Sequence, residues 1–218
     1  MMELTRQGSV FVLMMNSDDN RFNVESMRAI HAALDEVEAA AVPSALVVTG
    51  VGKFFSNGLD LAMVESGEVD LVGLARAAQE LMARTLLFRR PTVAAINGHC
   101  FAAGAMWTLA FDHRIMRADR GFWSLPEVDL GIPFTRGMTD LIMARLTPQT
   151  ATVAMTTGNR YGGEAARAAG IVDNAVPEDT LVSHAAELAE ALSAKSAETL
   201  STIKGMMYQG VADSLRSG

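Results

Sequence analysis

The chain has 218 residues, half of them apolar and a fifth charged, with a formal net charge of −7. This balance is typical of a globular protein with a substantial core and excludes a disordered chain. Nucleic acids and anionic membrane surfaces bind basic patches, so the acidic charge argues against both as partners.

The apolar pattern predicts alternating strands and helices, which favours an α/β fold with right-handed crossovers. The apolar run at 45–49 has the composition of a parallel strand buried on both faces. Residues 178–218 are expected to be purely helical. In chain order, the expected elements are a strand at 10–15, a helix between 23 and 43, a strand at 45–49, a loop at 50–57, a short helix from 58, a helix at 71–88, a strand at 92–96, a helix at 103–111, strands at 113–116 and 121–124, and helices at 136–146, 148–156, 163–169, 180–194 and 197–208.

The segment 92–111 raises the question of a membrane span, because its twenty residues carry no formal charge. Asn97 and Gly98 lie near its middle, and Asn-Gly is a strong turn signal. A turn leaves backbone groups unpaired, which lipid does not tolerate. We therefore expect a buried strand, a turn and a buried helix.

Cysteine use and the chain ends bear on compartment and metal binding. The single cysteine, Cys100, excludes an intrachain disulfide framework and a cysteine-cluster metal site, and no two histidines have metal-ligand spacing. No metal is expected. The N-terminus lacks the features of a signal peptide and the C-terminus lacks a peroxisomal tripeptide, so we expect a cytoplasmic protein.

Two segments share one design, in which a buried strand leads through a glycine-containing loop to the start of a helix. They are 54–60, FFSNGLD, and 97–105, NGHCFAAGA. Free N–H groups at helix starts favour negative charge, and two of them facing one point would form an oxyanion hole. The alternative for each is an ordinary strand-to-helix turn. Asp60 is expected to cap the helix that follows it, and His99 to stabilise its turn.

Two acids, Glu127 and Asp129, lie in an otherwise apolar segment beside Trp123, Leu125 and Leu130. A carboxyl group desolvated there would hold its proton more tightly and would suit general base catalysis near neutral pH. Either acid could instead cap the next turn or point to solvent. The pattern alone does not choose between Glu127 and Asp129.

Three motifs in this order resemble the crotonase (enoyl-CoA hydratase/isomerase) superfamily. They are FFSNGLD at 54–60, PTVAAING at 91–98 and LPEVDLGI at 125–132, and GGEA at 162–165 and AGIVD at 169–173 follow. The resemblance implies a spiral of ββα units over residues 1–177 and a helical trimerisation region at 178–218, which is shorter here than in longer members. It also implies an acyl-CoA thioester substrate, no cofactor beyond the coenzyme A of that substrate, and a homotrimer or a dimer of trimers.

The resemblance also assigns roles to residues. It places the oxyanion N–H groups on Leu59 and Ala103 and selects Glu127 as the catalytic acid. Asn57 and Leu61 would lie near the adenine of coenzyme A. The residues expected at the substrate are Ser56, Asn57, Gly58, Asp60, Leu61, Gly104, Met106, Trp107 and Phe134.

One departure from the family pattern bears on the reaction. Met106 stands where the family's first catalytic glutamate lies, and a thioether cannot usefully accept or donate a proton. Hydratases use two carboxylates to hold and activate water, whereas a 1,3-proton shift needs one. The sequence is therefore similar to single-glutamate Δ3,Δ2-enoyl-CoA isomerases, especially the plant peroxisomal type. Alternatives are a hydratase, thioester hydrolase or decarboxylase of the same superfamily, or a non-catalytic acyl-CoA-binding protein.

Overall fold

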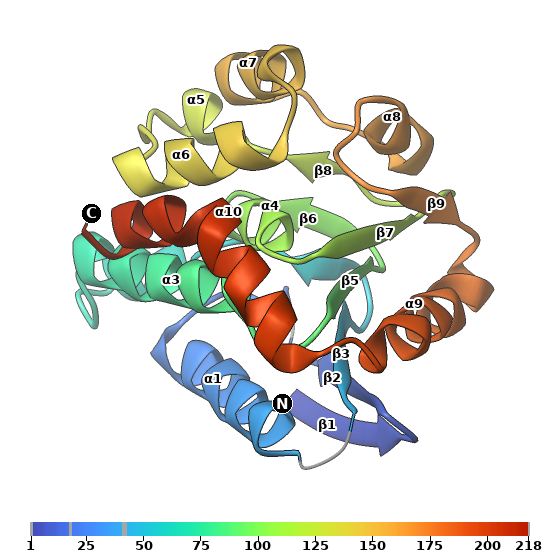
Figure 1. The fold of residues 1–218 in the computed structure, drawn as a ribbon. Coiled ribbons are helices and arrows are strands. Elements are labelled where there is room, and N and C mark those ends of the chain that lie inside the picture. The colour runs from blue at the N-terminus through green and yellow to red at the C-terminus, as the bar shows by residue number, and fades with distance from the viewer. Residues whose placement is uncertain (1, 18, 41–42, 218) are drawn as a thin grey trace.

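A six-stranded sheet forms the centre of the computed structural model, which describes residues 2–17, 19–40 and 43–217 (Figure 1). The first pair of strands is an antiparallel hairpin, and every later pair in this sheet is parallel. Long crossovers must therefore join the parallel strands. Their order across the sheet is β1 (Met2–Gln7), β2 (Val10–Met15), β3 (Ala45–Gly50), β5 (Thr92–Ile96), β7 (His113–Arg117) and β9 (Asn174–Val176).

A second, smaller sheet of three parallel strands consists of β4 (Phe54–Ser56), β6 (His99–Phe101) and β8 (Trp123–Ser124). The chain visits the two sheets in turn, and after each small-sheet strand it enters a helix. These helices are α2 (Leu61–Glu65), followed by α3 (Leu71–Leu86), then α4 (Ala103–Leu109) and α5 (Glu127–Leu130). This repetition confirms the expected ββα spiral. Because the small strands are parallel neighbours, it also brings successive helix starts to one edge.

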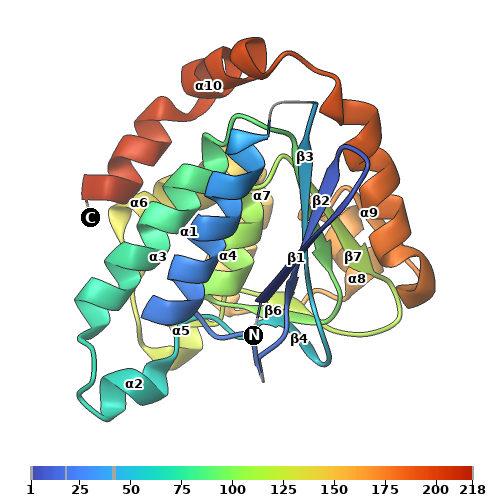
Figure 2. The ribbon, with the colours of Figure 1, turned by 90° about the horizontal axis from the view of Figure 1, so that it is seen from below.

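Helices cover both faces of the large sheet (Figure 2). On one face lie α1 (Val24–Ala39), α3 and α4, whose apolar sides share the main core with β2, β3 and β5. On the other face, α9 (Glu178–Ser193) packs Leu181, Ala185 and Ala189 against the strands. Burial on both faces explains why β3 and β5 are continuous apolar runs.

Of the remaining helices, three lie at the top of the view in Figure 1, and the last crosses the front of the molecule. They are α6 (Arg136–Arg145), α7 (Pro148–Thr157), α8 (Gly163–Ala168) and α10 (Ala197–Ser217). The expected helical character of the C-terminal region is confirmed, and both of its helices lie against the core, with α10 along α3 and α6. The prediction that the last helix ends near 208 is wrong, because Ala212 and Leu215 continue its buried stripe.

Four strands were not predicted, and each lacked a usable signal. Strand β1 is largely exposed, whereas β4, β6 and β9 have three residues each. The segment 92–111 forms β5, β6 and α4, which confirms the expected strand and helix. Among the described residues, no helix is long and apolar enough to cross a membrane.

Candidate active site

A cavity of about 510 Å³ opens where the helix starts after the small sheet meet α3 and α6. Most of its wall is apolar. Glu127 and Arg160 are the only titratable side chains among the described residues that line it. The lining residues are Asn57, Leu59, Leu61, Leu71, Val72, Ala75, Gln79, Phe101, Ala102, Ala103, Met106, Ser124, Pro126, Glu127, Leu130, Ile132, Pro133, Thr135, Met138 and Arg160.

Two backbone N–H groups at this cavity, those of Leu59 and Ala103, have no acceptor in the described part of the chain. Their neighbours are paired, since the Asp60 N–H donates to Phe22 O and the Ala102 N–H donates to Ser124 O. Unpaired backbone donors are uncommon in a protein interior. Two of them lining one cavity form a pair that can bind an oxyanion.

The two loops that carry these donors lie in contact. Gly58 has a φ of +81°, and a Cβ there would lie 3.0 Å from Ala102 Cβ and 3.4 Å from Ala103 N. Glycine is therefore required at this position by both backbone conformation and space. Ala102 adopts a φ of 51° and a ψ of −125°, which a side chain rarely allows and which is typical of functional sites. This backbone bend begins α4 and leaves the Ala103 N–H unpaired.

Glu127 is the acidic residue at the cavity. Its side chain is buried, with 6% of the residue exposed, and its Oε2 has no hydrogen-bond partner among the described residues. Burial raises the pKa of Glu127 to about 7, although a hydrogen bond from its own backbone acts in the opposite direction. Asp129 is exposed and lies outside the lining set, so the structure favours Glu127 of the two acids left open by the pattern.

This pKa predicts how activity depends on pH. A base must be ionised before it can accept a proton, so kcat/KM for proton abstraction should rise with pH and level off above about 7. The measurement is kcat/KM from pH 5 to pH 9 under constant ionic strength. A profile that levels off near pH 5 would show that Glu127 has an ordinary carboxyl pKa and that its burial does not tune it.

Met106 lies at the same cavity, three residues into α4, and only 2% of it is exposed. It lines the cavity at the position where the family resemblance places the first catalytic glutamate. Among the described residues, the lining set contains no carboxylate except Glu127. Two carboxylates that hold a water between them cannot be assembled from these walls.

The structure places some of the expected substrate residues at the cavity and others away from it. Asn57, Leu59, Leu61, Ala103, Met106 and Glu127 line it. Ser56 and Gly104 instead pack on each other, since a Cβ on Gly104 would lie 2.7 Å from Ser56 Cβ. Trp107, expected in the pocket wall, lies in the core, where Nε1 donates to Thr85 Oγ1 over 2.9 Å. Phe134 packs against the core and does not line the cavity.

The capping role expected of Asp60 is wrong, whereas the turn-stabilising role expected of His99 stays a prediction. Asp60 precedes α2, but its side chain makes no capping hydrogen bond and lies 3.9 Å from Arg21 Nη1. His99 does not stabilise its turn through a hydrogen bond of Nδ1, which is buried without a partner among the described residues. Its ring packs against Phe54, Phe101 and Phe122. The His99 side chain therefore packs among aromatic rings in the turn that we expected it to stabilise.

Sequence reasoning missed one whole wall of the cavity. It comes from α3 and from the start of α6, and it includes Ala75, Gln79, Thr135 and Met138. A signal was present, because Gln79 is a polar residue on the mostly apolar buried face of a long amphipathic helix. Among the described residues, no group of three or more metal-ligating side chains occurs here or elsewhere.

Comparisons with known proteins place this geometry in context. Residues 5–218 match the family model described as enoyl-CoA hydratase/isomerase. Enoyl-CoA delta isomerase 3 of Arabidopsis thaliana is 32% identical over 219 residues, with 95% of this chain and 92% of that protein covered. The 2,3-dehydroadipyl-CoA hydratase of Escherichia coli K12 is 29% identical, with 99% and 84% covered.

Solved structures share the fold. A probable enoyl-CoA hydratase from Mycobacterium tuberculosis superposes with a TM-score of 0.93 at 29% identity, covering all of this chain and 92% of that chain. A second structure of the same M. tuberculosis protein, described as an enoyl-CoA isomerase, gives a TM-score of 0.92 at 27% identity, with 99% and 94% covered. Hydratases and isomerases are both among these relatives, so the reaction has to be argued from the site.

Proposed function

The chain belongs to the enoyl-CoA hydratase/isomerase family, and on that basis we propose that it is a Δ3,Δ2-enoyl-CoA isomerase. Such an enzyme moves a carbon–carbon double bond of an acyl-CoA from C3 to C2, into conjugation with the thioester. The substrate supplies its own coenzyme A, and no further cofactor is required. An enoyl-CoA delta isomerase at 32% identity supports this reading, as does the composition of the cavity wall.

In the proposed reaction, the thioester oxygen accepts hydrogen bonds from the N–H groups of Leu59 and Ala103. The Glu127 carboxylate removes a proton from C2, and the electron pair of that bond forms a dienolate whose negative charge lies on the thioester oxygen. The two donors stabilise this charge as it develops. Glu127 then returns the proton to C4, which completes the 1,3-shift and restores the carboxylate.

The observation that carries this proposal is a cavity wall whose described residues contain a single carboxylate and, where the family resemblance places a second one, a methionine. Glu127 is the only acid among the described residues of the cavity wall, and Met106 fills the second position. A proton shift within one substrate needs one group that accepts and then donates. Addition of water needs a second group to hold and activate that water, which this wall does not supply.

Other thioester chemistry of the family uses the same pair of donors, and hydratases are among the relatives. Hydrolysis of the thioester or decarboxylation would also pass through an oxyanion. A binding protein without catalysis is the remaining alternative. The unpartnered Glu127 Oε2 and the raised pKa of this carboxyl argue against it, because a buried acid without a partner lowers stability and is typical of catalytic sites.

The proposal is tested by incubating the purified protein with 3-hexenoyl-CoA and following the conjugated enoyl thioester by its ultraviolet absorbance. We expect absorbance to rise in proportion to enzyme concentration and the product to be identified as 2-hexenoyl-CoA by chromatography. Release of free coenzyme A without this rise would indicate hydrolysis. Binding without any reaction would support the non-catalytic alternative.

We also propose a homotrimer, or a dimer of trimers, in the cytoplasm. The trimer is what the family resemblance implies for the helical region 178–218. The single cysteine, Cys100, is buried as a free thiol, which supports a reducing compartment. Sedimentation of the purified protein would decide between one, three and six copies.

A further inference from the structure

A polar pair lies in the apolar wall that α3 and α6 contribute to the cavity. Gln79 is 1% exposed, and its Oε1 accepts a hydrogen bond from Thr135 Oγ1 over 2.6 Å. Thr135 begins α6 and accepts in turn from the Met138 N–H over 3.2 Å. The single hydroxyl hydrogen of Thr135 is directed at Oε1, and this fixes the orientation of the Gln79 amide. The amide nitrogen, Nε2, therefore points away from Thr135.

Nε2 of Gln79 carries two donor hydrogens and has no acceptor in the described part of the chain. Gln79 lines the cavity. Its unpartnered Nε2 is not one of the fully buried atoms, so it is accessible from the cavity. The other lining residues on α3 and α6 offer no oxygen or nitrogen acceptor from their side chains, and the thioether of Met138 is only a weak acceptor. A purely aliphatic acyl chain would desolvate this donor without replacing its hydrogen bond, which is unfavourable.

The charge of the walls indicates which acceptor fits. Arg160 is the only cation among the described lining residues, and its guanidinium lies 5.7 Å from the ring centre of Phe101, which belongs to the small sheet. Gln79 and Thr135 lie on the helical wall and have no cation beside them among the lining residues. A carboxylate there would be desolvated without a counter-charge, whereas a hydroxyl or ketone oxygen needs only the amide donor.

We infer that Gln79 is a specificity residue that donates from Nε2 to a neutral oxygen on the acyl chain. The preferred substrates are therefore acyl-CoA thioesters that carry a hydroxyl or keto group distant from the thioester, rather than plain aliphatic ones. Thr135 is a positioning residue, since it holds the amide in the orientation that presents Nε2. This inference rests on the proposed function only in assuming that the cavity holds the acyl chain.

The test measures binding of saturated thioesters, which have no double bond to move and so report on the cavity independently of isomerisation. Hexanoyl-, octanoyl- and decanoyl-CoA are compared with their terminally hydroxylated counterparts by isothermal titration calorimetry, so that chain length scans the depth of the cavity. For the hydroxylated ligand that reaches Gln79, we expect Gln79→Met to weaken binding roughly tenfold, as befits one lost hydrogen bond. The same change should leave the aliphatic ligands unchanged or bound more tightly. The matched control is Gln149→Met on the exposed side of α7, which should alter neither series.

An equal loss for both series in Gln79→Met, or an unchanged preference for hydroxylated ligands, would overturn the inference. Circular dichroism on each variant shows whether the fold is retained, and Thr135→Val supplies a second variant that leaves Gln79 present but unoriented. Its selectivity should fall in the same direction. If the wild-type protein binds hydroxylated thioesters selectively but fails to isomerise 3-hexenoyl-CoA, the proposed function is wrong and this inference is retained. If the protein isomerises 3-hexenoyl-CoA but shows no preference for hydroxylated thioesters, the proposed function is retained and this inference is wrong.

Discussion

Replacing Glu127 with glutamine should reduce kcat for isomerisation of 3-hexenoyl-CoA by about a thousandfold, since a positioned acid/base typically contributes 10²–10⁴-fold. Glutamine keeps the size of the side chain but cannot accept the C2 proton. The two backbone donors stay in place, so KM should change little. The measurement is the rate of conjugation by absorbance for wild type and variant at pH 8, where the Glu127 carboxyl is ionised.

One control variant separates this effect from damage to the fold. Asp129→Asn removes the exposed acid two residues away and should retain near wild-type activity.

The raised pKa of Glu127 has a further consequence for stability. A group whose pKa is raised by folding stabilises the fold at low pH and loses that contribution as pH rises through the folded value, here about 7. Glu127→Gln should therefore unfold at a higher temperature than wild type at pH 8, and this advantage should shrink at pH 5. A Glu127→Gln enzyme with half the wild-type rate would exclude Glu127 as the base.

The second large effect is expected on stability and concerns the buried Lys204 of α10. Only 3% of Lys204 is exposed, and its Nζ donates to Asp112 Oδ2 over 2.7 Å and to Phe88 O over 2.8 Å. Asp112 Oδ2 also accepts from the backbone and side chain of Thr92, at the start of β5. This network ties α10 to the central sheet.

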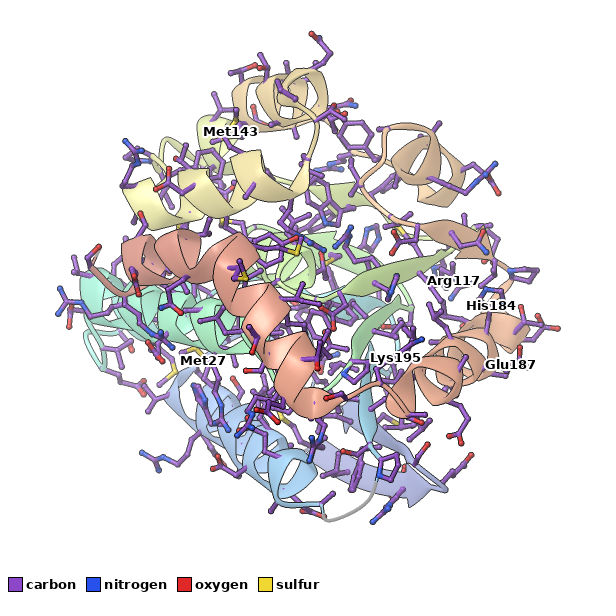
Figure 3. All side chains as sticks on the ribbon, in the orientation of Figure 1. Met27, Arg117, Met143, His184, Glu187 and Lys195 are labelled. Carbon is purple, nitrogen blue, oxygen red and sulfur yellow. The ribbon has the colours of Figure 1, made fainter. Side chains whose placement is uncertain are left out.

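Lys204→Met should lower the free energy of unfolding by about 3 kcal/mol, because removing one partner leaves a largely buried charge uncompensated. The measurement is chemical denaturation monitored by circular dichroism. Lys195→Met is the matched control, since Lys195 is exposed just after α9 (Figure 3) and should change stability little. Adding Asp112→Asn to Lys204→Met should recover part of the loss. A Lys204→Met protein as stable as wild type would show that α10 is held by its apolar face alone.

Long periodic segments were the part of the fold that sequence reasoning predicted well. The strands at 10–15 and 92–96 are where the apolar runs place them, and α1, α3 and α9 follow the helical spacing of their buried residues. The glycine loops and the acid at 127 were also visible, because their residue types are unusual for their positions. Choosing Glu127 over Asp129 required more than the pattern, since two acids so close in sequence differ in burial only once the chain is folded.

The undetected features depend on contacts between segments far apart in the sequence. The short strands β4 and β6 pair with each other, and three-residue segments carry no periodic signal. Trp107 was expected in the pocket wall, yet Thr85 and the rings of Phe22 and Phe111 hold it in the core. Gln79 shows the converse, because a polar side chain on a buried helix face became informative only when the cavity beside it was known.

We expect one carboxylate to suffice for the proposed reaction, and a comparison of two substrates on one preparation tests this. The initial rate of conjugation of 3-hexenoyl-CoA is measured beside the rate of hydration of crotonyl-CoA, at the same enzyme concentration and at pH 8. With Met106 in place of a second acid, we expect isomerisation to exceed hydration by about a hundredfold or more, which is the usual contribution of one acid/base group. Hydration of crotonyl-CoA as fast as isomerisation would contradict the account, because some other group would then hold and activate the water.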